Sequence, residues 1–454
     1  MIRDLRNLVM TGIDADGVNQ FERVVEQTLT FLPEGAQYLN SLLEKYPAFT
    51  LGWVFKAYIE ASDGRRSTLA NIAARVSHIE SLSFGSTQRE SLHIQALKQW
   101  SGGNLKGAMN TWQQILSVWP LDIIAYRQLL GQLFWFGQKA RALHVSKQIL
   151  PYWDSHVPGF WMFAASHAFA LEEAGEYEIS EAFARQTLQL NSADLIAKHT
   201  LAHLYEMQGR PKEGIDFLEK SASTFYQHNA FRGHLWWHLA LFYLEQGRVD
   251  DALSLFDKQI YPSESSLYLD IQNAASLLIR LEFLGVDVGN RWSGLVDSVN
   301  QNSQDSTIMF TEVHNAMVLA RTENNRKLDL SIEHISQQPL VGQQVEFSVA
   351  AMVMKGISAY HSAQYHRAIE CIGEVQHHYY QLGGSHAQQD VLFQYLIMSH
   401  AYLQNWQRVS SLLKTRYMAR ASAAQSEISL KQKFAQFDLI TNIDALLPHL
   451  SKVL

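Results

Sequence analysis

The chain has little of what marks a secreted, disulfide-bonded or membrane-spanning protein. Its 454 residues contain a single cysteine, Cys371, which excludes an internal disulfide and any zinc site built from several cysteines. No apolar stretch approaches the roughly 20 residues that cross a bilayer. The first residues carry charges at Arg3, Asp4 and Arg6, and no apolar core of signal-peptide length occurs before Asp14. We therefore expect a cytoplasmic protein with a buried thiol and no membrane partner.

Positive charge is also scarce. The 37 Lys and Arg residues face 44 Asp and Glu residues, a formal net charge of -7, and no block of basic residues stands out. Because nucleic-acid binders need basic surface to neutralise phosphates, this composition predicts no nucleic-acid partner. No Gly-rich phosphate loop, dinucleotide fingerprint or nucleophile elbow occurs either. No cofactor is expected, apart from the divalent metal considered below.

Prolines are few, nine in all, and apolar residues recur at spacings of three and four, which predicts helices almost throughout. No segment alternates convincingly like a strand. The turns between these helices are periodic, at Gly103, Gly137, Gly175, Gly209, Gly247 and Gly285, and then at Asn324, Gln364 and Gln404. A period of about 34 residues with a helix on each side of the turn is typical of tetratricopeptide repeats.

Small residues occur at fixed offsets from these turns, where they let two helices cross closely. Five residues after the turn come Ala108, Ala142, Ser180, Gly214 and Ala252, and seven before it come Ala168, Ala202 and Ala240. We predict an all-α, tetratricopeptide-repeat-like right-handed superhelix, an α-solenoid of antiparallel helix pairs. Residues 1–65 would form an N-terminal helical cap, residues 66–423 the repeats and residues 424–454 a C-terminal capping helix.

The segment "HTLAHLYEMQGR" places His199, His203 and Glu206 four and three residues apart, on one face of a helix. In a tetratricopeptide solenoid the first helix of each pair lines the concave surface, at positions 13, 10, 6, 3 and 2 before the turn. The triplet occupies three of these groove positions. The same rule selects further polar or aromatic residues, namely His93, Arg127, Glu172, Glu173, His234, Trp237, Glu245 and His314.

Several chemistries are compatible with these residues. Two imidazoles and a carboxylate are ligands for a divalent metal, although the spacing is not that of HExxH and residues seven apart on a helix lie roughly 10 Å from each other. The metal candidates are His199, His203, Glu206, His234 and His238. Acid/base chemistry would instead pair His203 or His238 with Glu206 or Glu173. The plain alternative is that each histidine is structural or solvated.

The chain resembles the tetratricopeptide repeat protein 38 family over nearly its whole length, from the "QRESLH" segment onward. The resemblance rests on "RESLH" (89–93), "HTLAHLYEM" (199–207), "HLWWHLAL" (234–241), "RLEFLGVDVGNRW" (280–292), "FTEVHNAM" (310–317) and "QLGGSHAQQDV" (381–391). It implies a helical fold and a polar groove without defining a reaction. The positions it implies are His93, Glu173, His199, His203, Glu206, His234, Trp237, His238, Asp270, His314, Gln388 and Asp390.

The chain departs from the family pattern at two places. It has Leu130 and Gly131 where the family has a His-Asp pair, and Leu235 and Asn273 where the family has Asn and Asp. If those groups belong to one shared chemistry, this chain has altered it.

We predict that the chain binds a small molecule or short peptide in a His/Glu-lined concave pocket. The candidate catalytic residues are His203, Glu206, His238 and Glu173, and the candidate ligand-binding residues are His199, His234, Trp237, Asp270, His314, Gln388 and Asp390. One alternative is an enzyme that uses the same cluster for acid/base or metal-assisted chemistry. Another is a plain protein-interaction scaffold. The ligand and the oligomeric state stay open.

Overall fold

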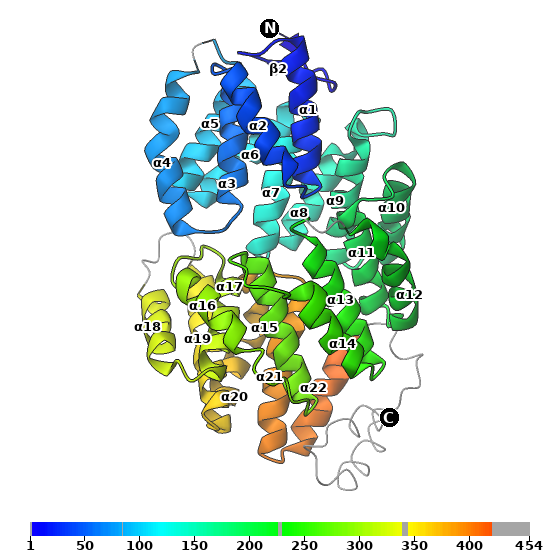
Figure 1. Cartoon of the computed structure of the whole chain (residues 1–454), viewed down its shortest axis with the longest axis vertical. Helices are drawn as coiled ribbons and strands as arrows, with labels where there is room; N and C mark the ends of the chain where they lie inside the picture. The colour runs from blue at the N-terminus through cyan, green and yellow to red at the C-terminus, as the bar shows by residue number, and fades with distance from the viewer. Residues whose placement is uncertain (1, 84, 226–228, 338–343, 420–454) are drawn as a thin grey trace. The chain divides into compact units, whose positions relative to one another are not determined.

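The structure is a computed structural model that describes residues 2–83, 85–225, 229–337 and 344–419, and nearly all of its elements are helices (Figure 1). Consecutive helices such as α5 and α6, α9 and α10, and α19 and α20 pack against each other. The prediction of an all-α, tetratricopeptide-like array of antiparallel helix pairs is confirmed. No helix in the described part of the chain is long and apolar enough to cross a membrane.

The chain divides into two compact units. The first comprises Met1–Leu201 and Ser223–Arg232, and the second comprises Ala202–Ala222 and Gly233–Leu454. The predicted boundaries at residues 65 and 66 stay a prediction, and the predicted capping helix at 424–454 lies outside the described residues.

The first unit begins with two short strands and continues in helices. Its elements are β1 (Ile2–Arg3), β2 (Val9–Met10), α1 (Ala15–Leu29), α2 (Glu34–Lys45), α3 (Thr50–Ala61), α4 (Arg66–Ser81), α5 (Gln88–Ser101), α6 (Leu105–Val118), α7 (Ile123–Trp135), α8 (Lys139–Ile149), the 3₁₀ turn η1 (Leu150–Tyr152), α9 (Phe160–Glu173) and α10 (Tyr177–Leu190). Helix α11 (Leu195–Met207) and the 3₁₀ turn η2 (Ala222–Thr224) each contribute residues to both units.

The second unit consists of helices in its described part. They are α12 (Pro211–Ser221), α13 (Arg232–Glu245, its first residue in the first unit), α14 (Val249–Leu255), the π-helical turn η3 (Phe256–Ile260), α15 (Tyr268–Phe283), α16 (Ser293–Asn302), α17 (Met309–Arg321), α18 (Asn325–Ser336), α19 (Gln344–His361), α20 (Tyr365–Glu374), the 3₁₀ turn η4 (Gln376–Leu382), α21 (His386–Tyr402) and α22 (Trp406–Ala419). The thiol of Cys371, on α20, is buried as predicted.

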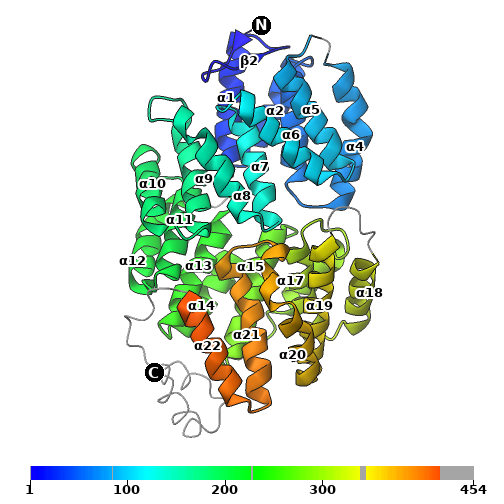
Figure 2. The same ribbon diagram turned by 180° about the vertical axis from the view of Figure 1, so that it is seen from behind.

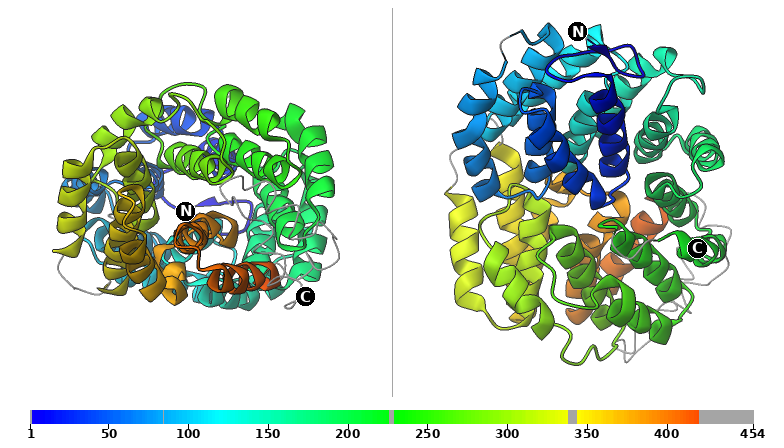
Figure 3. Two further views of the ribbon diagram at one scale, coloured as in Figure 1. Left: turned by 90° about the horizontal axis from the view of Figure 1, so that it is seen from below. Right: turned by 45° about the horizontal axis from the view of Figure 1, so that its top comes forward.

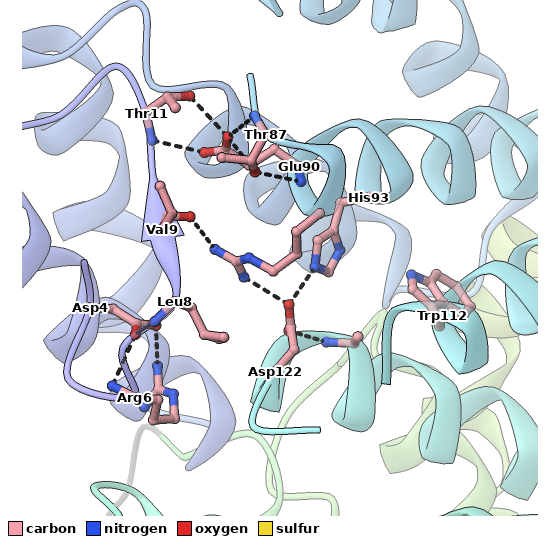
Figure 4. Close-up of polar contacts among 12 residues, drawn as sticks. Asp4, Arg6, Leu8, Val9, Thr11, Thr87, Glu90, His93, Trp112 and Asp122 are labelled. Atoms are coloured by element: carbon pink, nitrogen blue, oxygen red, sulfur yellow. Dashed lines mark hydrogen bonds and ion pairs between the residues drawn. The ribbon is translucent and has the colours of Figure 1, made fainter. Parts of the chain in front are cut away.

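The strand pair corrects the expectation that the N-terminal segment contains only helices. β1 and β2 pair antiparallel, with Ile2 opposite Met10 and Arg3 opposite Val9. Two residues per strand are too few to produce a period-two pattern that sequence inspection could detect. The connecting turn is held by Asp4, whose carboxylate accepts hydrogen bonds from the backbone N–H groups of Arg6 and Leu8 (Figure 4).

The turn ladder is confirmed by backbone geometry over six repeats and needs correction beyond them. Gly103, Gly137, Gly175, Gly209, Gly247 and Gly285 all have positive φ angles between 64° and 85°, the left-handed conformation that ends a helix most cheaply at glycine. In the later repeats this conformation falls on Glu323, Ala363 and Gln404. The predicted turns at Asn324 and Gln364 are therefore one residue late, because no glycine marks the position there.

The small residues lie at helix crossings, as their spacing predicts. In the first unit the hydroxyl of Ser180 on α10 donates to the carbonyl oxygen of Ala168 on α9 over 2.7 Å. In the second unit a Cβ atom placed on Gly214 of α12 would lie 2.4 Å from the ring of Phe242 on α13. The first contact joins the position five after a turn to the first helix of the same pair, and the second joins that position to the first helix of the next pair, so these small residues lie where helices cross closely.

The second unit buries the polar face of its first helices. Helix α21 contacts α15, α19, α20 and α22 (Figure 2), and the left view of Figure 3 shows this part of the chain from below. The guanidinium of Arg280 on α15 donates to the carbonyl oxygen of Ala387 on α21 over 2.8 Å. Polar residues on α13, α15 and α17 consequently lie in the interior of this unit.

Candidate functional site

Three histidines and one glutamate meet inside the second unit. His203 and Glu206 come from α11, and His234 and His238 come from α13. Each of the four side chains is at most 4% exposed. One ligand atom from each of the three imidazoles lies within 4.8 Å of the other two, and the His203 and His234 rings each lie 4.8 Å from the His238 ring between centroids. We call these four residues the histidine cluster.

Two acceptors face the Nδ1 atoms of this cluster. The Nδ1 of His234 lies 2.8 Å from Oδ1 of Asn273 on α15. The Nδ1 of His238 lies 3.5 Å from Oε2 of Glu206. Because Oδ1 of Asn273 accepts, the Nδ1 of His234 carries the proton and its Nε2 keeps a lone pair, and the carboxylate of Glu206 favours the same tautomer of His238.

The predicted ligand-binding residue Trp237 borders the cluster. Its indole stacks on the ring of His234, with centroids 5.1 Å apart, and its Nε1 donates to the hydroxyl of Ser276 over 3.0 Å. The guanidinium carbon of Arg280 lies 5.3 Å from the centroid of the Trp237 ring. The same guanidinium donates to the carbonyl oxygen of Ser276 over 3.1 Å. Trp237 thus connects the cluster to a buried cation on α15.

The electrostatics keep the buried imidazoles neutral. Burial lowers the pKa of His234 and of His238 well below the ordinary value, and the nearby imidazoles of His238 and His203, respectively, lower them further. The hydrogen bond that His234 donates to Asn273 raises the pKa of His234 to a smaller extent. Neutral imidazole is the form that accepts a proton or ligates a metal.

His314 is also buried in this unit, on α17. Its Nδ1 donates to the carbonyl oxygen of Phe310 over 2.8 Å. Burial lowers its pKa to about 4, and the charge of Arg280 adds to the effect. The structure therefore gives His314 a fixed tautomer and a neutral ring, as expected of a binding residue or of a satisfied core histidine.

Two predicted residues belong to the first unit. Glu173 at the end of α9 forms an ion pair with Lys139, with 2.6 Å between the carboxylate and Nζ. His199, one turn before His203 on α11, contacts the rings of Phe169 and Phe231. Both residues lie in the first unit, so neither belongs to the histidine cluster of the second unit.

Three further residues have structural partners of their own. Asp270 lies in the first turn of α15 and accepts from the hydroxyl of Ser265 over 2.7 Å. Gln388 completes a capping box with Ser385 at the start of α21. Asp390 pairs with Arg416 of α22 over 2.8 Å. The capping box and the ion pair account for the positions of Gln388 and Asp390, whereas Oδ1 of Asp270 also lies close to Gly233, the residue before His234.

His93 has a structural environment in the first unit (Figure 4). Its Nε2 lies 3.0 Å from Oδ2 of Asp122, which also accepts from Arg89 over 2.7 Å. Its Nδ1 lies 3.3 Å from the hydroxyl of Tyr58. This network joins α3, α5 and α7, and its members are saturated by each other. We therefore assign His93 to the core of this unit and not to a groove.

Sequence reasoning missed Asn273 and Arg280 as members of the site. Asn273 appeared only as a departure from the family pattern, and Arg280 only as part of a quoted segment. A detectable signal existed, because α15 carries Asn273, Ser276 and Arg280 at spacings of three and four, on one helix face. An inward face with three polar residues is unusual in a helix that otherwise buries aliphatic side chains.

The cluster can perform two kinds of chemistry. Three neutral imidazoles can hold a divalent transition metal ion. The pairing of His238 with Glu206 is the geometry of a general base whose imidazole is oriented by a carboxylate. The observed separations, 3.5 Å for that pair and up to 4.8 Å between imidazole ligand atoms, match neither a coordinated ion nor a short hydrogen-bonded relay.

Comparison with known proteins gives structural neighbours and no family. No protein-family model matches the chain. Similar solved structures include the human IFIT1 dimer with PPP-AAAA, at 14% identity, covering 97% of this chain and 93% of that chain with a TM-score of 0.43. The human IFIT1 dimer with m7Gppp-AAAA is 15% identical, covering 94% and 96% with a TM-score of 0.42. The P58(IPK) TPR domain is 11% identical, covering 86% and 99% with a TM-score of 0.20.

These neighbours are helical-repeat proteins, and they contradict one sequence-based expectation. We excluded nucleic acid as a partner because of the net charge of -7. IFIT1, with a related arrangement of helices, is seen with PPP-AAAA and m7Gppp-AAAA. The exclusion is therefore wrong: net charge averages over the whole chain, whereas a ligand responds to the local charge of the surface that holds it.

Proposed function

We propose that this chain is a tetratricopeptide-type binding protein that holds a small molecule at the histidine cluster of its second unit. We also propose that it is a cytoplasmic relative of the tetratricopeptide repeat protein 38 family, on the six ordered segments it shares with that pattern. The single observation that carries the proposed function is the burial of His203, Glu206, His234 and His238 side by side, each at most 4% exposed.

The composition of the cluster is unusual for a helix crossing. Histidine and glutamate side chains are seldom completely buried in a protein core. The helices that carry the cluster otherwise bury Ala202, Leu204, Leu239 and Ala240, which fill a helix crossing without polar atoms. Four buried polar residues at one place therefore suit a ligand-binding site better than helix packing alone.

Burial also favours a small molecule over a peptide. An extended peptide lies along an open groove and contacts several repeats at their surface. The cluster residues are buried from solvent. Helix α21 packs against α15, and Arg280 on α15 donates to it. A ligand of a few heavy atoms needs only a local opening, so we favour it.

An enzyme that uses the same residues is the second candidate. The observation in its favour is the 3.5 Å separation between Nδ1 of His238 and the carboxylate of Glu206, a carboxylate-oriented imidazole. The hydroxyl of Ser276 already accepts from the indole of Trp237, whose ring contacts His238. We therefore keep binding as the primary proposal and name no reaction.

Native mass spectrometry of the purified full chain tests the proposal. We expect a non-covalent organic adduct on the wild type that is lost in His203→Ala and in Glu206→Gln, because both substitutions remove groups that contact it. His378→Ala, an exposed histidine of the same unit, should keep the adduct. Two results together would contradict the proposal. One is a wild type without an adduct, and the other is an unchanged melting temperature of this protein in millimolar small carboxylates, phosphates and amino acids.

A further inference from the structure

We propose that His203, His234 and His238 form a binding site for a divalent transition metal ion, Zn²⁺ in the first instance, with a fourth coordination position open to an exogenous ligand. The inference uses three residues of the second unit only. It rests on the proposed function for the identity of the fourth ligand, which would be the small molecule. The metal site itself stands on the geometry below.

The separations are within reach of coordination. Zinc binds imidazole nitrogen at about 2.0–2.1 Å in tetrahedral geometry, so two such nitrogens lie about 3.3 Å apart. The ligand atoms of the three histidines are at most 4.8 Å from one another. Each ring therefore needs to move inward by less than about 1 Å, which side-chain rotations provide without moving α11 or α13.

Two of the three rings are already oriented as ligands. Metal-ligating histidines commonly donate their second ring N–H to a carboxylate or carbonyl oxygen, which fixes the tautomer and directs the other nitrogen to the ion. Asn273 plays this part for His234 at 2.8 Å and Glu206 for His238 at 3.5 Å. This assigns Glu206 and Asn273 as positioning residues and not as ligands.

The amide nitrogen of Asn273 is a second, independent indication of a ligand. It is buried and has no hydrogen-bond partner among the described residues, while the oxygen of the same amide accepts from His234. The side chain as a whole is 1% exposed. A donor left unpaired at such depth is costly, and an oxygen ligand in the fourth coordination position would accept from it.

Charges of both signs act on the site. The guanidinium of Arg280 lies 5.3 Å from the centroid of the Trp237 ring and donates to the carbonyl oxygens of Ser276 and Ala387. The carboxylate of Glu206 lies 3.5 Å from Nδ1 of His238. This carboxylate would offset part of the positive charge of an ion bound among the imidazoles.

Metal binding to the full chain tests the inference directly. After treatment with EDTA and its removal, the chain is equilibrated with ZnCl₂ or CoCl₂ alone, and bound metal is measured by elemental analysis and by the visible spectrum of cobalt. We expect one tightly bound ion per chain and a cobalt spectrum typical of four-coordinate nitrogen ligation. His234→Ala and His238→Ala should lose this ion, and Asn273→Ala and Glu206→Gln should weaken it about 10–100-fold.

His378→Ala is the matched control and should bind the ion as the wild type does. Wild-type chain without a tight ion, or equal binding by wild type and His238→Ala, overturns the inference. If circular dichroism shows that His234→Ala or His238→Ala is unfolded, Asn273→Ala decides, since unchanged zinc affinity in that folded variant also overturns it. A change in the cobalt spectrum on addition of acetate would show that the fourth coordination position is open to an exogenous ligand.

The two proposals fail separately. An organic adduct that survives EDTA treatment of a chain without zinc affinity leaves the proposed function standing and removes the metal. The opposite result is a chain that binds zinc, with the expected effects of the substitutions, but carries no organic adduct. If no small carboxylate, phosphate or amino acid changes its cobalt spectrum either, the metal site stands and the proposed small-molecule binding is wrong.

Discussion

At the scale of single residues, the two units use buried histidines in different ways. In the first unit His93 has a charged partner, Asp122, which it shares with Arg89. In the second unit His234 and His238 face each other and His203, and their nearest acceptors are an amide and one carboxylate. A saturated ion network stabilises a fold, whereas imidazoles grouped around one point suit a ligand.

Asp122→Asn tests whether the network of Asp122, His93 and Arg89 stabilises the first unit. Burial alone would raise the pKa of Asp122, but the charges of His93 and Arg89 outweigh it and hold that pKa below its ordinary value. The substitution leaves Arg89 without a counter-charge, so we expect a loss of about 3–5 kcal/mol in the free energy of unfolding. Urea denaturation measures it.

Asp154→Asn is the control for this experiment, because Asp154 is an exposed carboxylate of the same unit and pairs with the exposed His156. Its effect on the free energy of unfolding should be small beside that of Asp122→Asn. Equal effects of the two substitutions would show that the buried network does not stabilise the unit.

At the scale of elements, the fold depends on helices that approach closely at small residues. Ala108 and Ala252 are completely buried, and the contact between Ser180 and the Ala168 carbonyl shows how near the helix backbones come. The histidine cluster uses a different face of the same first helices. Residues at the helix crossings and residues of the cluster can therefore be substituted separately.

Ala252→Leu should overpack the crossing of α14 and lower the free energy of unfolding by about 1–3 kcal/mol. Asp250→Leu introduces the same side chain at an exposed position of α14 and should cost less than about 1 kcal/mol, mainly through loss of a first-turn acid. Differential scanning calorimetry compares the two. An unchanged melting temperature for Ala252→Leu would mean that the residue is not at a crossing.

At the scale of the whole molecule, both units bury neutral histidines and should weaken in acid. Burial lowers the pKa of His167 in the first unit and of His361 in the second to about 4, from 6.5. The unfolded chain takes up these protons as the pH falls through 6.5, while the folded chain resists until about pH 4. Stability from this source is full above pH 6.5 and is lost between pH 6.5 and 4, by about 3 kcal/mol for each group.

The measurement compares wild type with His167→Asn, because other groups titrate in the same range. Asp194, whose pKa burial raises to about 6, acts in the opposite direction. The difference in the free energy of unfolding between the two proteins should change by about 3 kcal/mol between pH 7 and pH 4. Asn retains a polar atom near Ser146, whose hydroxyl lies 2.6 Å from Nδ1 of His167. A difference independent of pH would contradict the assignment.

Local sequence was enough to predict the helix pairs. The left-handed turns at Gly103 to Gly285 and the crossings at Ser180 and Gly214 follow from properties of short segments: the 3.6-residue period, glycine at positive φ and small side chains at contacts. Where the signal is absent, at Glu323 and Ala363, the predicted turn moved by one residue. The β1–β2 pair was not predicted, because two residues per strand are too few to show an alternating pattern of apolar and polar residues.

The membership of the site was decided by tertiary structure. Groove offsets selected His203, Glu206, His234 and Trp237. The family resemblance gave Gln388 and Asp390 the same standing, although the fold uses them for a capping box and an ion pair. The acceptor that orients His234 comes from Asn273, 39 residues away in sequence. A polar side chain acquires its role from the partners that packing brings to it, and those partners lie on other helices, beyond the range over which a helical period carries information.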